Sequence, residues 1–572
     1  MGIAVQARLV ARDPKGSQVM PRNSPIDQIA NRWVETITKL SPSFATGVGS
    51  PIGADKLDDH SPEAHATYAA EAKKVLTELS RVEPTDETDR VTLDAMTSDL
   101  SLTLEMHEAS LYRRDLNVIA SPAQGIRDVF DLSPTSTEKD WEDLVSRMNA
   151  VGESLTGYQR SLQLGIAAKD TPAKRQVIAN IDQALEIASK EGFFVKFAES
   201  AKSDSGDLPE SLRTELAKAA QSATAAYGEF AKFLKEQLLP NASEVDAIGR
   251  ERYELFSRGF LGAKIDLDAT YQWGIEELAR VVAEQSEVAN QIKPGASIEE
   301  AVKFLDEDPS RKLHGTDALQ KWMQGKSDEA IASLSGSHFE IAEKMKTLEC
   351  MIAPTQSGGI YYTPPTDDFS RPGRMWWSVP PGVTEFNTWR ELTTVYHEGV
   401  PGHHLQVAQA VFNKDDLNNW RRNVSWTSGH GEGWALYAER LMLDLGYLDD
   451  PGDRLGMLDG QRMRAARVVL DIGVHLSKPK LTGAGVWDHE YALEFMLKNV
   501  NMPKEFVTFE VNRYFGWPGQ APSYKVGQRI WEQIRDEVKA KQGASFDIKS
   551  FHKKALNLGG LGLDSLRNAL TS

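Results

Sequence analysis

Apolar residues recur every three or four positions through much of the chain between about residues 60 and 350, a spacing that predicts amphipathic helices. Segment 271–288 shows this pattern clearly. Its apolar residues fall mainly at helical spacing: Trp273, Ile275, Leu278, Val281, Val282 and Val288. Typical helix starts precede several such segments, for example at Ser61-Pro62-Glu63 and at Thr85-Asp86-Glu87. We therefore expect a long succession of helices in this part of the chain.

The pattern changes after residue 350, where two short aromatic segments, 359–365 and 374–380, are bounded by Gly and Pro. Such segments are typical of strands, and together they predict a hairpin or a sheet edge. Helical spacing returns at Thr388, which forms a capping-box pattern with Glu391 and begins a helix that reaches residue 398. The whole pattern predicts a mainly α fold, a large multi-helical body with a small β-hairpin or sheet beside one central helix.

Three regions of the chain differ in composition. Residues 1–27 are expected to form a flexible N-terminal arm, since the first twenty or so are rich in Ser, Pro and basic residues. Residues 28–350 are expected to form a helical scaffold half. Residues 351–572 hold most of the tryptophans and histidines, so we expect this half to carry the chemistry. Because no long low-complexity linker separates the halves, we expect one continuous two-lobed body.

Composition and charge exclude several classes of function. The 572 residues are 41% hydrophobic and 26% charged, which is typical of a globular protein. The net charge of −17 argues against nucleic acid or anionic lipid as a partner. With no apolar run of about 18–20 residues and no signal-peptide pattern, we expect a cytoplasmic protein without a membrane span. The single cysteine, Cys350, excludes an internal disulfide and a cysteine-based metal site.

The most specific chemical signal is the segment His397-Glu398-Gly399-Val400-Pro401-Gly402-His403-His404. In an H-E-x-x-H helix, two histidines one turn apart bind one zinc while the glutamate polarises its water. Here position 401 is proline, and an uninterrupted helix would separate His397 from His403 by about 9 Å of rise. Pro401 and Gly402 interrupt the helix, so we expect a wide turn that brings His403, or alternatively His404, beside His397.

A third ligand is expected from the segment that starts at Gly429, where Glu432 stands near the beginning of another helix. Glu439 lies seven residues later on the same helix face, either as a partner of a metal ligand or as a solvated or ion-paired residue. His430 could also reach the metal, but we favour a hydrogen-bonding role for it in the loop before this helix.

Two later segments offer groups that could support catalysis. On segment 462–475, a helix would place Arg464, Arg467, Asp471 and His475 on one face, either as partly buried catalytic groups or as an exposed ion-pair ladder. In segment 510–527, Tyr514 or Tyr524 is expected to donate to an oxyanion and Arg513 to clamp a carboxylate, although each tyrosine could equally be a packing residue. His475 is expected to assist catalysis without binding the metal. The hairpin could bind an extended peptide along its edge. We assign substrate contacts to four residues: Tyr362, Arg371, Arg467 and Gln520.

These motifs resemble the bacterial family catalogued as domain of unknown function 885, whose members carry H-E-x-x-P-G-H, then an E-G-W-A-x-Y helix and an R-Y-x-x-x-P-G-Q-A segment. The match covers most of residues 350–530. That family is similar to zinc metallopeptidases with a His-Glu helix and a downstream Glu ligand, which include helical oligopeptidases and carboxypeptidases. The resemblance implies one zinc ion per chain, held by His397, His403 and Glu432, with Glu398 as general base.

The leading hypothesis is a zinc-dependent hydrolase, a metallopeptidase that cleaves short peptides and needs no obligatory protein partner. One alternative is a metal-dependent amide or ester hydrolase of a non-peptide metabolite. Another is a non-catalytic helical binding protein whose histidines bind no metal. Serine-hydrolase and P-loop nucleotide chemistry are disfavoured, because neither G-x-S-x-G nor G-x-x-x-x-G-K-[ST] occurs in the chain.

Overall fold

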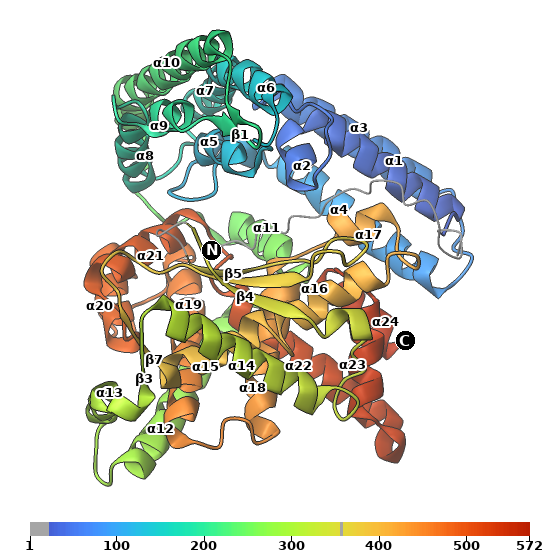
Figure 1. Ribbon diagram of the computed structural model, residues 1–572, viewed down its shortest axis with the longest axis vertical. Helices are drawn as coiled ribbons and strands as arrows, with labels where there is room; N and C mark the ends of the chain where they lie inside the picture. The colour runs from blue at the N-terminus through green and yellow to red at the C-terminus, as the bar shows by residue number, and fades with distance from the viewer. Residues whose placement is uncertain (1–21, 355–358) are drawn as a thin grey trace.

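Helices make up most of the computed structural model, which describes residues 22–354 and 359–572. The mainly α fold predicted from the sequence is confirmed. In Figure 1, α5 to α10 form an upper lobe and α11 to α24 a larger lower one, with α1 and α3 extending beside the upper lobe. Among the described residues, no helix is both long enough and apolar enough to span a bilayer.

The helices of the first part of the chain are α1 (Pro25–Leu40), α2 (Pro42–Gly47), α3 (Pro62–Leu79), α4 (Glu87–Glu108), α5 (Pro122–Leu132), α6 (Glu138–Asn149), α7 (Val151–Ala168), α8 (Lys174–Ile187), α9 (Phe193–Glu199) and α10 (Glu210–Phe233). Those of the second part are α11 (Arg250–Leu261), α12 (Leu267–Ile292), α13 (Ile298–Glu307), α14 (Thr316–Leu334), α15 (Thr388–Glu398), α16 (His403–Phe412), α17 (Asn419–Asn423), α18 (Ser428–Asp444), α19 (Pro451–His475), α20 (His489–Asn499), α21 (Lys504–Gly516), α22 (Ser523–Gln542), α23 (Ile548–Asn557) and α24 (Leu563–Thr571).

The predicted flexible arm, residues 1–27, extends too far along the chain. Residues 1–21 lie outside the described part, but α1 already begins at Pro25, behind a capping box formed by Ser24 and Asp27. Asp27 is fully buried and accepts a hydrogen bond of 2.9 Å from Asn418. This contact joins the start of the chain to a segment nearly 400 residues away.

The hydrophobic cores do not divide at residue 350. The buried residues of one core all lie within residues 116–238, from just before α5 to just after α10. The largest core joins helices from both predicted halves, and α12 packs against α19. Gly274 permits this close approach, because a Cβ there would lie 2.9 Å from the side chain of Val468. Helices that precede residue 350 therefore belong to the same packed body as those that follow it.

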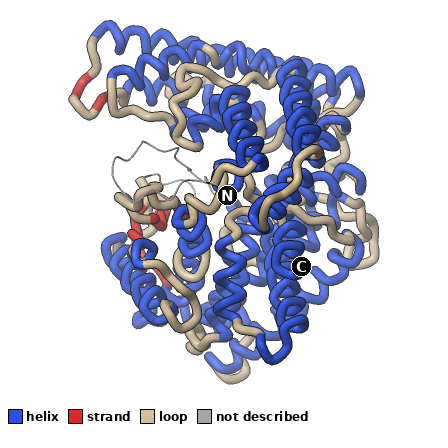
Figure 2. The backbone as a smooth tube through the Cα atoms, turned by 90° about the vertical axis from the view of Figure 1, so that its right-hand side faces the viewer, coloured by secondary structure: helices blue, strands red, loops and turns tan. Residues whose placement is uncertain are grey.

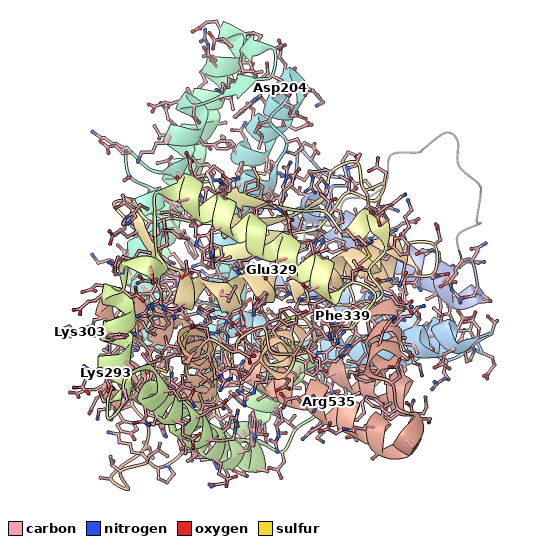
Figure 3. The ribbon with its side chains drawn as sticks, turned by 60° about the horizontal axis from the view of Figure 1, so that its bottom comes forward. Asp204, Lys293, Lys303, Glu329, Phe339 and Arg535 are labelled. Carbon is pink, nitrogen blue, oxygen red and sulfur yellow. The ribbon has the colours of Figure 1, made fainter. Side chains whose placement is uncertain are left out.

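The sheets are small. β5 (Ile360–Thr363) and β6 (Gly373–Trp377) pair antiparallel, which confirms the predicted hairpin, and β4 (Leu348–Ile352) adds a parallel third strand in the order β4-β6-β5. Two further pairs are β3 (Lys312–His314) with β7 (Glu385–Asn387), and β1 (Lys202–Ser203) with β2 (Gly206–Asp207). Figure 2 shows how little of the fold these strands occupy. In Figure 3, Asp204, in the turn between β1 and β2, lies in the upper lobe, and Lys293 and Lys303 lie in the lower one.

The predicted capping box at the start of α15 is wrong. The cap position is Asn387, the last residue of β7, and Thr388 is the first helical residue. The Thr388 hydroxyl donates to the carbonyl of Arg311, just before β3, so it ties the helix to the β3–β7 pair. Glu391 instead faces a cavity, where burial raises its pKa to about 7 against the effect of Arg390.

Candidate metal centre

A turn between α15 and α16 folds the chain back on itself at Gly399–Gly402. The N–H of Gly402 donates to the carbonyl of Tyr396 at 3.0 Å, and Val400 and Pro401 are joined by a cis peptide bond. A side chain at position 402 would overlap the carbonyl oxygen of His397, so only glycine fits there. The predicted wide turn is confirmed: the rings of His397 and His403 have their centroids 4.8 Å apart.

Glu432 reaches the two histidines from α18. Its Oε2 lies 3.3 Å from Nε2 of His397 and 3.6 Å from Nε2 of His403. The three candidate ligand atoms lie within 4.8 Å of one another, and all three side chains are buried. The Trp434 indole, two residues after Glu432, donates to the carbonyl of Pro401 at 2.9 Å and so holds the α15–α16 turn against α18. Residues from three helices therefore converge on one point.

Close packing of α18 on α22 sets the depth of Glu432. Side chains at Gly433 and Gly527 would each clash with the backbone of the opposite helix, at Gly527 and Gly429 respectively. The two helices can approach this closely only because these positions carry no Cβ. Gly429 and Gly433 on α18 and Gly527 on α22 therefore allow the carboxylate of Glu432 to lie in the interior.

Glu439 is buried and contacts the cluster, which answers the question that the sequence left open. Its Oε1 lies 2.7 Å from Nδ1 of His397, and its Oε2 accepts a 2.7 Å hydrogen bond from the Thr393 hydroxyl. Since an ionised carboxylate only accepts, Nδ1 carries the proton when His397 is neutral, and the Nε2 lone pair then points toward Glu432.

The charges of the cluster shift each other's pKa values. Burial would lower the pKa of His397, but the hydrogen bonds to Glu432 and Glu439 outweigh it and raise the pKa to about 10. Burial would raise the pKa of Glu432, but the two histidines hold it well below its usual range. The opposite charges of His397 and Glu432 therefore stabilise each other within the buried cluster.

His404, the alternative ligand, lies outside the cluster. Its Nε2 donates to the carbonyl of Met345 at 2.8 Å, and its Nδ1 lies 2.9 Å from the hydroxyl of Tyr362. Burial lowers its pKa to about 4, so the neutral ring donates with one nitrogen and accepts with the other. Both ring nitrogens are occupied within the protein. Tyr362, whose hydroxyl contacts His404, is completely buried. This burial corrects its assignment as a substrate contact.

Glu398 follows His397 directly and faces the same cavity. It is 6% exposed, and its Oε2 has no hydrogen-bond partner among the described residues. Burial raises its pKa, against the opposing charges of His403 and His397. A buried carboxylate oxygen without a partner is unusual in a folded protein and calls for a ligand or a catalytic role.

The cavity beside the cluster has a volume of about 430 Å³ and is formed mainly by α15, α18, α19 and α21, with contributions from α22 and β5. Its acidic residues are Glu391, Glu398, Glu432, Glu439, Asp459 and Glu510. Its arginines are Arg390, Arg464, Arg467 and Arg513. Tyr524 also lines it, and burial raises the pKa of that phenol, so the hydroxyl keeps its proton.

Glu510 binds two of these arginines. It accepts hydrogen bonds from Arg513 through Nε and Nη2, both at 2.9 Å, and from Arg467 at 2.8 Å. The Tyr514 hydroxyl donates to the same carboxylate at 2.6 Å and accepts from Arg467, while Arg513 also donates to Gln520. This network corrects three assignments: Arg513 is not free to clamp a substrate carboxylate, Tyr514 is not free to donate to an oxyanion, and Gln520 serves Arg513 instead of a substrate.

His475 and Arg371 are placed away from the cavity, which corrects their assignments. His475 donates from Nε2 to the carbonyl of Tyr514 at 3.0 Å, and burial lowers its pKa to about 4. Arg371 donates to the carbonyls of Pro364 and Pro372 in the loop between β5 and β6. His430 lies inside the first turn of α18, not in a loop, with its Nδ1 3.3 Å from the Gln406 amide.

Comparisons with known proteins identify the family from the sequence and the fold from solved structures. A family model described as "Bacterial protein of unknown function (DUF885)" matches residues 42–570. A solved structure described as "the putative lipoprotein from Colwellia psychrerythraea" is 23% identical, with a TM-score of 0.81 over 95% of this chain and 98% of that one. A second, described as "a putative lipoprotein of unknown function from Shewanella oneidensis", is 17% identical, with a TM-score of 0.75 over 96% of this chain and 100% of that one.

No curated protein matches the chain. The likeness to zinc metallopeptidases finds no counterpart in these comparisons, and at these identities the solved structures show the fold alone. The cytoplasmic location and the absence of an obligatory partner stay predictions.

Proposed function

We propose that this chain, which belongs to the bacterial DUF885 family, is a zinc-dependent hydrolase that cleaves short peptides, with His397, His403 and Glu432 as metal ligands and Glu398 as general base. One observation carries the proposal. Three buried candidate ligand atoms converge beside a cavity whose neighbouring glutamate has a carboxylate oxygen without a described partner.

The spacing of the ligand atoms fits a tetrahedral zinc. Zinc bonds of about 2.0–2.1 Å at tetrahedral angles put two ligand atoms about 3.4 Å apart. The two His–Glu separations here are 3.3 and 3.6 Å. Two imidazole nitrogens and one carboxylate oxygen favour zinc over magnesium or calcium, which prefer oxygen ligands. Three protein ligands also leave a fourth position open, as catalytic zinc sites do.

The residues around the cluster have complementary roles in this proposal. When bound, zinc supplies a Lewis acid that lowers the pKa of a water molecule toward neutrality. Glu398 accepts the proton of the attacking water, and its raised pKa brings it closer to the operating pH. In this proposal Tyr524, which lines the same cavity, donates to the carbonyl oxygen of the scissile bond. Glu439 contacts Nδ1 of His397 and accepts a hydrogen bond from Thr393, so these two residues fix the orientation of the imidazole ring.

A peptide is favoured as the substrate because a sheet edge borders the cavity. Ile360 and Tyr361 of β5 line it, and β5 is the terminal strand in the order β4-β6-β5. The free edge of such a strand can pair with an extended peptide backbone, which a small metabolite lacks. The cavity volume of about 430 Å³ suits a short segment of chain.

The test is zinc content and peptide cleavage measured together. The protein, purified without chelators, is analysed for metals and incubated with a peptide mixture, as isolated, after chelation, and after zinc is restored. We expect about one zinc per chain and cleavage that disappears on chelation and returns with zinc. Cleavage that is indifferent to chelation would remove zinc from the mechanism. A protein that takes up no zinc and leaves all peptides intact would favour a non-catalytic binding protein.

A further inference from the structure

Three of the four arginines that line the cavity have acidic partners within the protein. Arg390 pairs with Asp306 at 3.0 Å. Arg467 and Arg513 share the carboxylate of Glu510, as described above. Their guanidinium groups are therefore already committed to protein acceptors.

Arg464 is the exception among the described residues. It has no hydrogen bond or ion pair there, and its buried Nε has no partner. Its guanidinium lies over Gly460, one turn earlier on α19, where a Cβ would come within 2.7 Å of Nη1. The glycine thus makes room for the group at the cavity wall. Leaving a partly buried cation unpaired costs free energy, which an anionic ligand would offset.

The position of Arg464 relates it to the proposed reaction centre. It lines the same cavity as Glu398 and Glu439 and forms no described ion pair with either. The other three arginines of the cavity wall each have an acidic partner. An anionic part of a substrate would therefore settle beside Arg464, whose guanidinium has no described partner.

We propose that Arg464 binds the free carboxylate of the substrate, so that the cavity selects short peptides, or other acylated amino acids, whose terminal carboxylate lies close to the scissile bond. This inference rests on the proposed function. The planar guanidinium suits a carboxylate because it can donate two parallel hydrogen bonds to it. One guanidinium without a described partner offers one pair of parallel donors, which suits a carboxylate better than a dianionic phosphate.

The test compares peptide acids with their C-terminal amides. The zinc-loaded full chain is assayed on short peptides in both forms, and the Glu398→Gln protein is titrated calorimetrically with the same pairs, so that binding is measured without turnover. We expect the acid to be preferred about 100-fold in kcat/KM and in binding. Arg464→Gln should remove that preference by weakening the acid alone, and Arg464→Lys should retain part of it.

Arg454→Gln is the matched control, because Arg454 lies on the same helix outside the residues that line the cavity and the substitution changes the net charge equally. It should keep the full preference. If the native protein cleaves and binds the acid and the amide equally well, the inference is overturned, whereas the proposed hydrolase function still stands. An equal loss on both forms in Arg464→Gln would also overturn it, since the arginine would then be only a counter-charge to the buried carboxylates. If no peptide is cleaved, the proposed function fails, and equal binding of the two forms would refute the role of Arg464 separately.

Discussion

The substitution Glu398→Gln separates the proposed catalytic role of this residue from its structural one. Glutamine has nearly the same shape, and the Glu398 Oε2 that it replaces has no hydrogen-bond partner among the described residues. Burying an uncharged amide costs less than burying a carboxylate whose pKa burial already raises. We therefore expect the free energy of unfolding to fall by no more than about 1 kcal/mol. Since Glu398 is not one of the three clustered ligand residues, zinc content should also be unchanged.

The rate of peptide cleavage should respond very differently. Removing a general base typically costs about 10²–10⁴-fold in rate, which corresponds to about 2.7–5.4 kcal/mol in the activation free energy. The measurement is kcat and KM on one cleaved peptide, with product quantified by mass spectrometry, alongside zinc content and thermal unfolding of the same preparation. The loss should lie in kcat, with KM little changed, because the proposed base acts on the attacking water rather than on the bound substrate.

Glu391→Gln provides a matched control for this experiment. Glu391 lies on the same helix and the same cavity wall, and its carboxyl is also buried, but it does not belong to the ligand cluster. We expect this variant to lose less than about tenfold in kcat. A Glu398→Gln protein that keeps full zinc and more than a tenth of the native rate would refute the assignment of Glu398 as general base.

Three further predictions test the surroundings of the site. Glu439→Gln removes the charge that orients His397 and should weaken zinc affinity about 10–100-fold in a chelator competition, whereas unchanged affinity would contradict that role. Glu510→Gln leaves two buried arginines poorly compensated and should cost about 3–5 kcal/mol in denaturant unfolding, a loss that a purely peripheral ion pair would not produce. Burial raises the pKa of Asp471 to about 7, above its ordinary value, so the folded state keeps a proton that the unfolded state releases, and this group lowers stability as the pH rises from about 4 to 7. Asp471→Asn should flatten that part of the stability curve, as followed by unfolding at several pH values, and an unaltered curve would exclude this residue as its source.

Local patterns in the sequence account for much of the fold. The apolar spacing of segment 271–288 corresponds to α12, whose buried residues include Leu278, Val281 and Val288. The aromatic segments after residue 350 form β5 and β6, with Tyr362 opposite Met375. Such elements are predictable because helical and strand periodicity are properties of a short stretch of chain. The capping pattern at Thr388 gave a wrong prediction because the carbonyl of Arg311, 77 residues earlier in the chain, accepts the hydrogen bond of its hydroxyl.

At the candidate site, too, some features follow from local sequence patterns and others from contacts with distant residues. The motifs around His397 and Glu432 predicted which side chains would come together, and the Pro-Gly break predicted the turn between His397 and His403. The choice between His403 and His404 depended on Met345 and Tyr362, which lie 59 and 42 residues away from His404 along the chain. No local pattern contains that information.

The arginines show most clearly what only the tertiary structure decided. In the sequence, Arg464, Arg467 and Arg513 are equivalent basic residues on apolar helices. Packing of α19 against α21 brings Glu510 to Arg467, while Arg513 reaches the same carboxylate within its own helix. Arg464, one turn away, is left facing the cavity with no described partner. The sequence determines that a charge is present, but whether it is neutralised depends on which distant side chains the fold brings within a few ångströms of it.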